Sequence, residues 1–212
     1  MSRLHVFDMD GTLLEGSACF EISRSVGVLE ENLQIEQAWI AGDLDDQDYW
    51  VRCLPLWKGL TDADIDIAFE RAPWLDGISR VFGDIRERDE FSVVITQSPT
   101  FFAERLKRWG AHFAFGAHVC PGESSGAERM VSSDDKLAIT HKLAGELDLK
   151  YDDCIAYGDS RSDLALFGTL SNTVAVNACE EIEGLAKASY QGGDLWHAYQ
   201  VGRALLDGQT VI

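Results

Sequence analysis

Four short apolar runs constrain the fold of this 212-residue chain more than any other feature. Each is rich in small and branched apolar residues and is followed by polar residues or glycine, which is typical of buried parallel strands. Stretches with helical periodicity follow or separate them, at 99–110, 136–149 and 178–188. Strands that alternate with helices predict an α/β fold, in which helices cover both faces of a parallel sheet. The four runs are LHVF (4–7), FSVVIT (91–96), CIAY (154–157) and TVAV (173–176).

The region from about residue 16 to residue 77 has a different pattern of apolar and polar residues. It contains no convincing strand, but it has helical patterns at 31–42, 45–57 and 61–72. Four of the six tryptophans lie here, and packing in a small helical core is the favoured explanation for them. The pattern predicts an α/β core formed by residues 1–14 and 78–212, with residues 15–77 inserted after the first strand as a separate helical region.

Composition excludes several classes of partner. The net charge is -18 and no basic stripe is present, so a nucleic acid is not expected as a partner, whereas a small phosphate ester needs only a few local cations. No segment reaches the roughly 18 to 20 apolar residues that cross a bilayer, and the N-terminus lacks the pattern of a signal peptide. Five scattered cysteines without a CxxC motif indicate reduced thiols. We expect a cytoplasmic protein without membrane contact, either a monomer or a homodimer.

Polar side chains follow three of the four apolar runs. The carboxyl ends of parallel strands meet at one edge of a sheet, where open α/β sheets bind ligands, so these side chains are expected to lie together. A lysine also opens the helix that leads to the third run. The residues are Asp8 and Asp10 after the first run, Thr96, Gln97 and Ser98 at the second, Asp159 and Asp163 after the third, and Lys136 in the helix.

These residue types suit phosphoryl transfer. A carboxylate can attack phosphorus and form an aspartyl-phosphate, and a second carboxyl group can protonate the leaving oxygen. Mg²⁺ held by oxygen ligands reduces the repulsion between the two anions, while hydroxyl groups and a lysine hold the phosphoryl oxygens. Each residue alone has a structural alternative: Asp8 or Asp159 could fill a turn, and Lys136 could be an exposed lysine. Their joint arrangement favours an active site.

The same residues resemble the four motifs of the haloacid dehalogenase superfamily. The run Asp8-Met9-Asp10-Gly11-Thr12-Leu13 resembles the first motif, and GDSRSD (158–163) resembles the fourth. Thr96 at the end of a strand matches the second motif, with Ser98 and Pro99 fitting a common variant, and Lys136 matches the third. The resemblance implies a Rossmann-like core with a helical cap.

The resemblance also implies a role for each site residue. Asp8 would be the nucleophile and Asp10 the general acid/base. Magnesium would be bound by the carboxylates of Asp8 and Asp159 and by the main-chain carbonyl of Asp10, with Asp163 supporting the metal site or Lys136. The implied phosphate-binding residues are Gly11, Thr96, Gln97, Ser98 and Lys136.

Asp10 distinguishes branches within the superfamily, because the phosphotransferase branch keeps an aspartate at this position and the dehalogenases do not. We therefore predict a magnesium-dependent phosphomonoesterase that hydrolyses a small phosphorylated metabolite through an aspartyl-phosphate. A phosphomutase or phosphotransferase could use the same intermediate. A non-catalytic binding domain on this fold is less favoured, because such domains usually lose one of the four acidic residues.

The helical insertion resembles the cap of the phosphoserine-phosphatase-like subgroup. An ungapped comparison places Ser17 where that subgroup has an acidic residue and Cys53 where it has an arginine. Glu15 and Arg52 lie close to these two positions and are the alternative substrate-selecting residues. The comparison disfavours phosphoserine, and the sequence does not predict which metabolite is the substrate.

Overall fold

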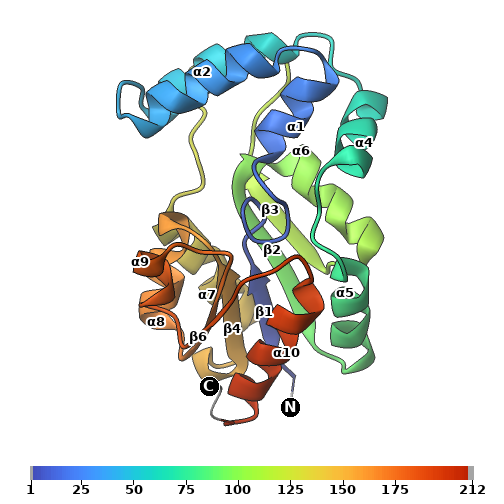
Figure 1. Ribbon diagram of the computed structural model, residues 1–212, viewed down its shortest axis with the longest axis vertical. Coiled ribbons are helices and arrows are strands. Elements are labelled where there is room, and N and C mark those ends of the chain that lie inside the picture. Colours follow the sequence, from blue (N-terminus) through green and yellow to red (C-terminus); the bar gives the residue numbers. More distant parts are fainter. Residues whose placement is uncertain (1, 210–212) are drawn as a thin grey trace.

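The computed structural model describes residues 2–209, which form a six-stranded sheet beneath a group of helices (Figure 1). All described strand pairs are parallel, and the strand order is β3-β2-β1-β4-β5-β6. The four predicted strands are confirmed, and the sheet also contains β3 and β6 at its two edges. The strands are β1 (Leu4–Phe7), β2 (Phe91–Pro99), β3 (Phe113–Ala117), β4 (Cys154–Gly158), β5 (Asn172–Val176) and β6 (Ala188–Tyr190).

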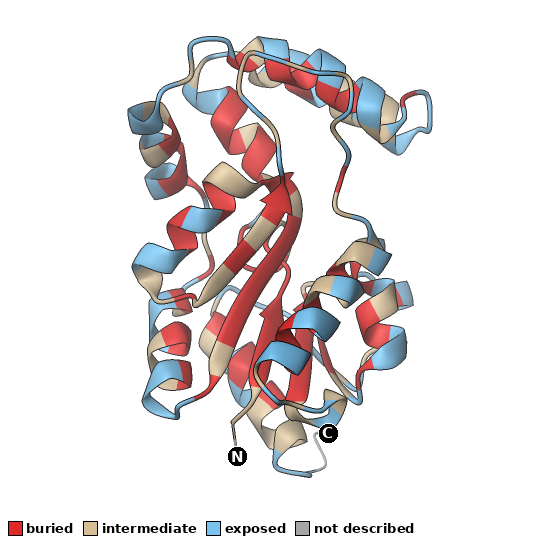
Figure 2. Cartoon of the chain, turned by 180° about the vertical axis from the view of Figure 1, so that it is seen from behind, coloured by how far each residue is buried: buried red, intermediate tan, exposed pale blue. Residues whose placement is uncertain are grey.

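Helices cover both faces of the sheet, as the sequence predicts. Side chains alternate along β1: Phe7 packs with α5 (Ile78–Glu87) and α10 (Leu195–Leu206), whereas Leu4 and Val6 pack with α7 (Ser133–Glu146) and α8 (Leu164–Thr169). Figure 2 shows the strands buried almost throughout and the helices buried mainly on their inner sides. The remaining short elements of the core are α6 (Thr100–Ala103), η2 (Glu104–Trp109), η3 (Tyr151–Asp153), η4 (Arg161–Asp163) and α9 (Glu180–Glu183).

The helix predicted over 178–188 is much shorter in the structure. It is reduced to α9, and Ala188 instead begins the edge strand β6, where it pairs with Val174. Gly184, which immediately follows α9, is a poor helix former, so the backbone hydrogen bonds of the sheet edge compete successfully with the helical pattern. Over residues 2–209, every helix is too short or too polar to span a bilayer.

Residues 15–77 form helices above the carboxyl ends of the strands (Figure 1). The two segments that join this region to the sheet are tied together, because Glu15 N donates to Pro73 O at 2.9 Å and Leu75 N donates to Leu13 O at 2.9 Å. Trp50 and Trp57 are fully buried in this region, as the packing explanation requires. The elements are α1 (Ala18–Ser25), α2 (Leu29–Ile40), α3 (Asp46–Cys53), η1 (Leu54–Trp57) and α4 (Asp62–Arg71).

A buried polar network lies at the amino end of the sheet, opposite the cap. His5 has no exposed surface, and its Nε2 lies 2.9 Å from Glu90 Oε2. Arg203 Nη1 donates to the two oxygens of Glu90 at 2.7 and 2.6 Å. Burial lowers the pKa of His5, although the hydrogen bond to Glu90 opposes the shift. Burial alone would raise the pKa of Glu90, but the hydrogen bonds from His5 and Arg203 outweigh it and lower this pKa.

We expect this network to make the protein less stable in acid. The unfolded chain protonates His5 near pH 6.5, above the lowered pKa in the folded state, so stability is lost as pH falls through this range. Glu90 adds a further loss below its unfolded pKa of 4.5. The free energy of unfolding, measured by urea denaturation between pH 7.5 and 5.5, should fall by up to about 1.4 kcal/mol per pH unit for the one proton of His5.

Two matched variants distinguish the contribution of His5 to the pH dependence of stability from the contributions of other titrating groups. His5→Gln should flatten the pH dependence over this range, whereas His118→Gln, at an exposed histidine, should leave it unchanged. An unchanged slope in His5→Gln would contradict the assignment to this network.

Candidate active site

The nucleophile predicted from the sequence stands at the point where the strand order reverses. Asp8 directly follows β1, whose last residue, Phe7, is flanked by Val94 of β2 and Tyr157 of β4. Asp8 N donates to Tyr157 O at 2.9 Å, and the residue is only 5% exposed. Ligands of open α/β sheets bind at such a switch point.

Three carboxylates meet at this edge of the sheet. One oxygen from each of Asp8, Asp159 and Asp163 lies within 4.8 Å of the others. Burial, and then the charge of Asp163, raise the pKa of Asp8 well above its usual range and that of Asp159 to about 7. Crowded carboxylates of this kind offer the oxygen ligands that Mg²⁺ prefers, and a cation would relieve their repulsion. The residues therefore fit the expected metal, to which Asp10 would contribute its main-chain carbonyl.

Lys136 is the cation of this cluster. It has no exposed surface, and its Nζ lies 2.8 Å from both Asp8 Oδ1 and Asp163 Oδ1. Nζ also donates to Ser162 Oγ at 2.8 Å. Burial alone would lower the pKa of Lys136, but the two carboxylates outweigh it and raise this pKa. The alternative that Lys136 is an exposed surface lysine is therefore wrong.

Asp10 is held by one group from the cap and one from the sheet. Its Oδ1 accepts a hydrogen bond from Ala18 N, the first residue of α1, at 2.6 Å, and its Oδ2 accepts one from Thr96 Oγ1 at 2.6 Å. Burial raises the pKa of Asp10, although these hydrogen bonds oppose the shift. Thr96 Oγ1 in turn accepts a hydrogen bond from Ser98 N at 3.0 Å, so the end of β2 orients the Asp10 carboxyl group.

Two glycines allow the carboxylates to approach the backbone. Gly11 has φ +79°, and a Cβ at this position would lie 2.2 Å from Asp159 Oδ2. A Cβ at Gly158 would lie 2.3 Å from Asp163 Oδ2. Any side chain at these positions would displace the acidic cluster.

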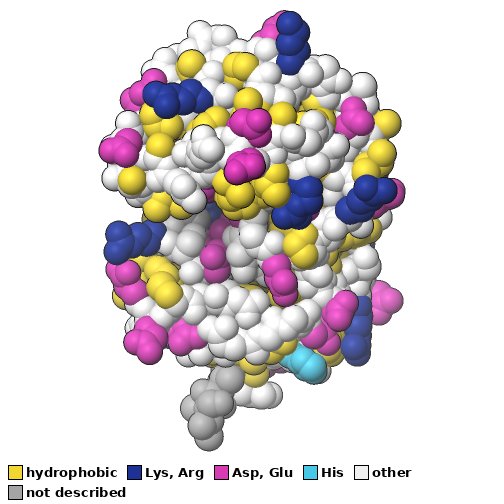
Figure 3. Space-filling model, turned by 45° about the horizontal axis from the view of Figure 1, so that its top comes forward, with side chains coloured by type: hydrophobic (Ala, Val, Ile, Leu, Met, Phe, Trp, Pro, Cys, Tyr) yellow, Lys and Arg dark blue, Asp and Glu magenta, His cyan; other side chains and the backbone are white. Residues whose placement is uncertain are grey.

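A cavity of about 440 Å³ lies between this cluster and the cap helices. Figure 3 shows a hollow across this side of the molecule, with acidic side chains inside it and hydrophobic side chains along its rim. Its lining from the core consists of Asp10, Gly11, Gln97, Ser98, Met130, Asp159 and Ser160, and its lining from the cap consists of Gly16, Ser17, Cys19, Phe20, Glu36, Trp39, Ile40 and Tyr49.

Most of the predicted site residues thus meet at or beside one cavity, but two of the cap residues do not. Ser17 lines the cavity, and its side chain caps α1 by accepting a hydrogen bond from Cys19 N at 3.2 Å. Glu15 and Arg52 are exposed, and neither lines the cavity. Cys53 is buried within the cap, where its sulfur accepts a hydrogen bond from Asn32 Nδ2 at 3.0 Å.

Several residues at this site are absent from the sequence-based prediction. Thr12 Oγ1 donates to Asp159 Oδ1 at 3.3 Å, and Ser162 Oγ contacts Lys136. Both lie inside the motifs that carry the prediction, so their position in the motif is a usable signal. Glu36 and Met130 line the cavity from positions outside the motifs, and no local pattern distinguishes them.

Comparison with known proteins agrees with this geometry. The family model of haloacid dehalogenase-like hydrolases matches residues 5–168. The phosphoserine phosphatase of Archaeoglobus fulgidus is 24% identical over 192 residues, which are 88% of this chain but only 56% of that protein. The phosphoserine phosphatase of Methanocaldococcus jannaschii is 24% identical over 170 residues, which cover 78% of this chain and 81% of that protein.

Solved structures share the fold. A substrate-bound phosphoserine phosphatase superposes with a TM-score of 0.77 at 21% identity, covering 94% of this chain and 98% of the other. A phosphoserine phosphatase structure with an analogue of the phospho-aspartyl intermediate gives a TM-score of 0.76 at 22% identity, with the same coverage. The family model covers most of the sequence and every motif residue from Asp8 to Asp163, and the chain therefore belongs to the haloacid dehalogenase-like hydrolase family.

Proposed function

We propose that this hydrolase is a magnesium-dependent phosphatase that cleaves a small phosphate monoester through an aspartyl-phosphate on Asp8. The observation that carries the proposal is the pairing of Asp8 with Lys136 at 2.8 Å inside a buried acidic cluster, beside a cavity lined by Asp10. Membership of the family and the relatives named phosphoserine phosphatases support the phosphatase class.

The two oxygens of Asp8 have different environments. Oδ1 lies 2.7 Å from Met9 N, which donates to it, and 2.8 Å from Lys136 Nζ. Oδ2 has one long contact among the described residues, from Ser162 Oγ at 3.5 Å. We assign Oδ2 as the oxygen that attacks phosphorus, because its lone pairs are the less engaged, while Lys136 and Met9 fix the carboxylate through Oδ1.

Asp10 can hold and move the proton of the reaction. Burial raises its pKa, and in its protonated form the carboxyl group can donate to the leaving oxygen as the bond to phosphorus breaks. The resulting carboxylate then takes a proton from the water that hydrolyses the aspartyl-phosphate. Thr96 and the amide of Ala18 keep the group oriented in both steps.

An anionic substrate beside anionic carboxylates is repelled by them, and cationic groups at the site reduce this repulsion. Magnesium, when bound by Asp8, Asp159 and the Asp10 carbonyl, reduces the repulsion between nucleophile and phosphate. Lys136 supplies a fixed positive charge beside Asp8, and Asp163 holds this lysine through Oδ1.

Removal of divalent ions should abolish the activity. With EDTA, phosphate release from p-nitrophenyl phosphate should fall at least about 100-fold, because three crowded carboxylates then face the phosphate without a compensating ion. Added Mg²⁺ should restore the rate, whereas EDTA saturated with Mg²⁺ beforehand should have no effect. A rate that is insensitive to EDTA would contradict the proposal.

Product analysis separates hydrolysis from transfer to another acceptor. If water is the acceptor, a sugar bisphosphate offered with Mg²⁺ should yield one equivalent of inorganic phosphate for each ester cleaved. A rearranged sugar phosphate without phosphate release would instead indicate a phosphomutase.

A further inference from the structure

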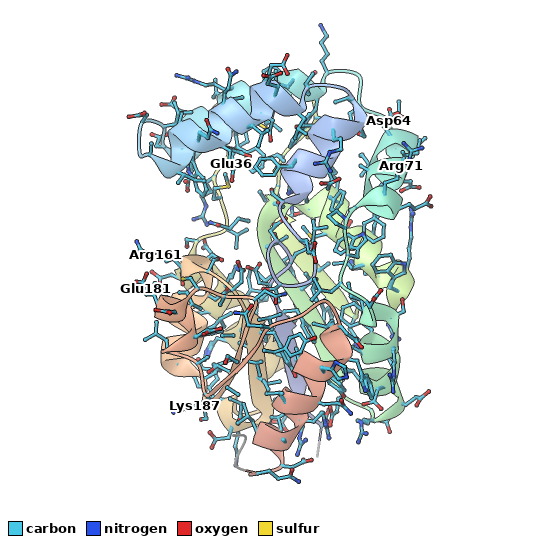
Figure 4. The ribbon with its side chains drawn as sticks, in the orientation of Figure 1. Glu36, Asp64, Arg71, Arg161, Glu181 and Lys187 are labelled. Carbon is cyan, nitrogen blue, oxygen red and sulfur yellow. The ribbon has the colours of Figure 1, made fainter. Side chains whose placement is uncertain are left out.

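The cap end of the cavity is formed by one face of α2. Glu36, Trp39 and Ile40 are three and four residues apart, so they share a face of this helix, and all three line the cavity. Figure 4 shows Glu36 on the side of α2 that faces the core. The group that leaves phosphorus must occupy this end, because Asp10 and Asp159 line the other.

The cap end of the cavity carries one carboxylate, Glu36, and no basic side chain among the described lining residues. Three carboxylate side chains line the whole cavity: Asp10, Glu36 and Asp159. No lysine, arginine or histidine is among its described lining residues. Glu36 forms no ion pair with any residue from 2 to 209. Lys136 is fully buried and already paired, so it cannot neutralise an anion at the cap end. A carboxylate on the leaving group would therefore be repelled here.

Aromatic rings complete the surroundings of Glu36. Phe20, Trp39 and Tyr49 line the same cavity, and the ring centroids of Trp39 and Tyr49 lie 5.7 Å apart. Burial raises the pKa of Glu36, the Tyr49 hydroxyl opposes this shift, and the charge of Asp10 adds to it. Aromatic faces and a carboxylate together attract a cation, and a bound cation would favour the charged form of Glu36.

We infer that the leaving group of the substrate carries a positively charged nitrogen and no carboxylate, and that Glu36, Trp39 and Tyr49 receive this nitrogen. The inference rests on the proposed phosphatase function and specifies its substrate as the phosphate ester of a cationic amino alcohol. Glu36 is then a specificity-determining residue, remote from the reacting atoms.

Three small esters of similar size test the charge preference directly. O-phosphoethanolamine carries a cationic group, propyl phosphate a neutral one and phosphoglycolate a carboxylate at nearly the same distance from phosphorus. We expect kcat/KM for phosphoethanolamine to exceed that for propyl phosphate at least about 10-fold. We expect kcat/KM for phosphoglycolate to be at least about 10-fold lower than that for propyl phosphate. Effects of this size are those of attraction or repulsion by one partly buried carboxylate, Glu36.

A matched pair of variants assigns the preference to Glu36. Glu36→Gln should reduce the ratio of kcat/KM for phosphoethanolamine over propyl phosphate at least about 10-fold, mainly through KM for the cationic ester. Glu31→Gln, at an exposed position in the first turn of the same helix, should leave this ratio unchanged. A role of Glu36 in folding alone would lower activity on all esters together and leave the ratio unchanged.

The outcomes separate the inference from the function on which it rests. Hydrolysis of propyl phosphate and p-nitrophenyl phosphate without a preference for phosphoethanolamine would overturn the inference and leave the phosphatase function intact. A preference that persists in Glu36→Gln would overturn the assignment to Glu36. Failure to hydrolyse any of the four esters with Mg²⁺ would overturn the proposed function, and the inference with it.

Discussion

Asp8→Asn should lower kcat for p-nitrophenyl phosphate at least about 10,000-fold, the largest loss expected from any single substitution in this chain. The amide of asparagine is a poor nucleophile and cannot form the aspartyl-phosphate. Folding should survive, because Lys136 keeps its partner Asp163 at 2.8 Å and the buried cluster loses one of its mutually repelling charges. The measurement is the steady-state rate with Mg²⁺, together with thermal unfolding of the same preparation.

Asp148→Asn is the matched control for this variant. Asp148 is exposed and has φ +55°, a conformation that asparagine also tolerates, so both the rate and the unfolding temperature should stay close to those of the parent protein. If Asp8→Asn retained more than a small fraction of the parent rate, Asp8 would not be the nucleophile.

Lys136→Met should damage both stability and catalysis. The substitution leaves the buried carboxylates of Asp8 and Asp163 without their cation, and removing one partner of a buried ion pair costs about 3–5 kcal/mol. Activity should fall at least about 1,000-fold, because the nucleophile loses its orientation and the phosphate a nearby positive charge. The free energy of unfolding should be measured without added Mg²⁺, since the metal could compensate for the missing charge.

Two further variants test whether charge pairing causes this loss. Lys142→Met, at an exposed position of the same helix, should leave stability and activity nearly unchanged. Lys136→Met combined with Asp163→Asn should recover part of the stability without recovering activity, because one unpaired carboxylate has been removed. If the single variant Lys136→Met were as stable as the parent protein, the inferred pairing would be wrong.

The sheet could be predicted where the strands are rich in branched residues. VVIT within β2 and TVAV within β5 consist mainly of branched residues, and both are strands in the structure. FAFGA, which forms β3, contains glycine and no branched residue, and β6 has only three residues. Pairing with a neighbouring strand determines these two edge strands, so their own sequences give little signal.

The candidate site could be predicted to the extent that its residues follow strands. The sequence predicts that Asp8 and Asp159 lie together because parallel strands end at one edge, and the structure brings their oxygens within 4.8 Å. Lys136 shows the limit of this reasoning. Its helix is visible in the sequence, but only tertiary packing shows that its side chain turns inward to two carboxylates.

No sequence pattern identifies Glu36 as a residue of the site. It stands among other polar residues of α2, and its helical spacing with Trp39 and Ile40 fits a solvent-facing stripe as well as a cavity wall. The angle at which α2 lies above the sheet decides between the two, and that angle depends on contacts between distant segments. Substrate-selecting residues on such a helix therefore become apparent only in three dimensions.

Evolution can alter the two ends of this cavity separately. The proposed nucleophile, Asp8, and its partner Lys136 belong to the sheet region, whereas Glu36, Trp39 and Tyr49 belong to the helices between the first two strands. A mutation in α2 or α3 can therefore exchange one metabolite for another while the costly chemistry at phosphorus is inherited unchanged. Recruitment of this chain to a new substrate would then require changes on the cavity-facing sides of α2 and α3, with no new catalyst.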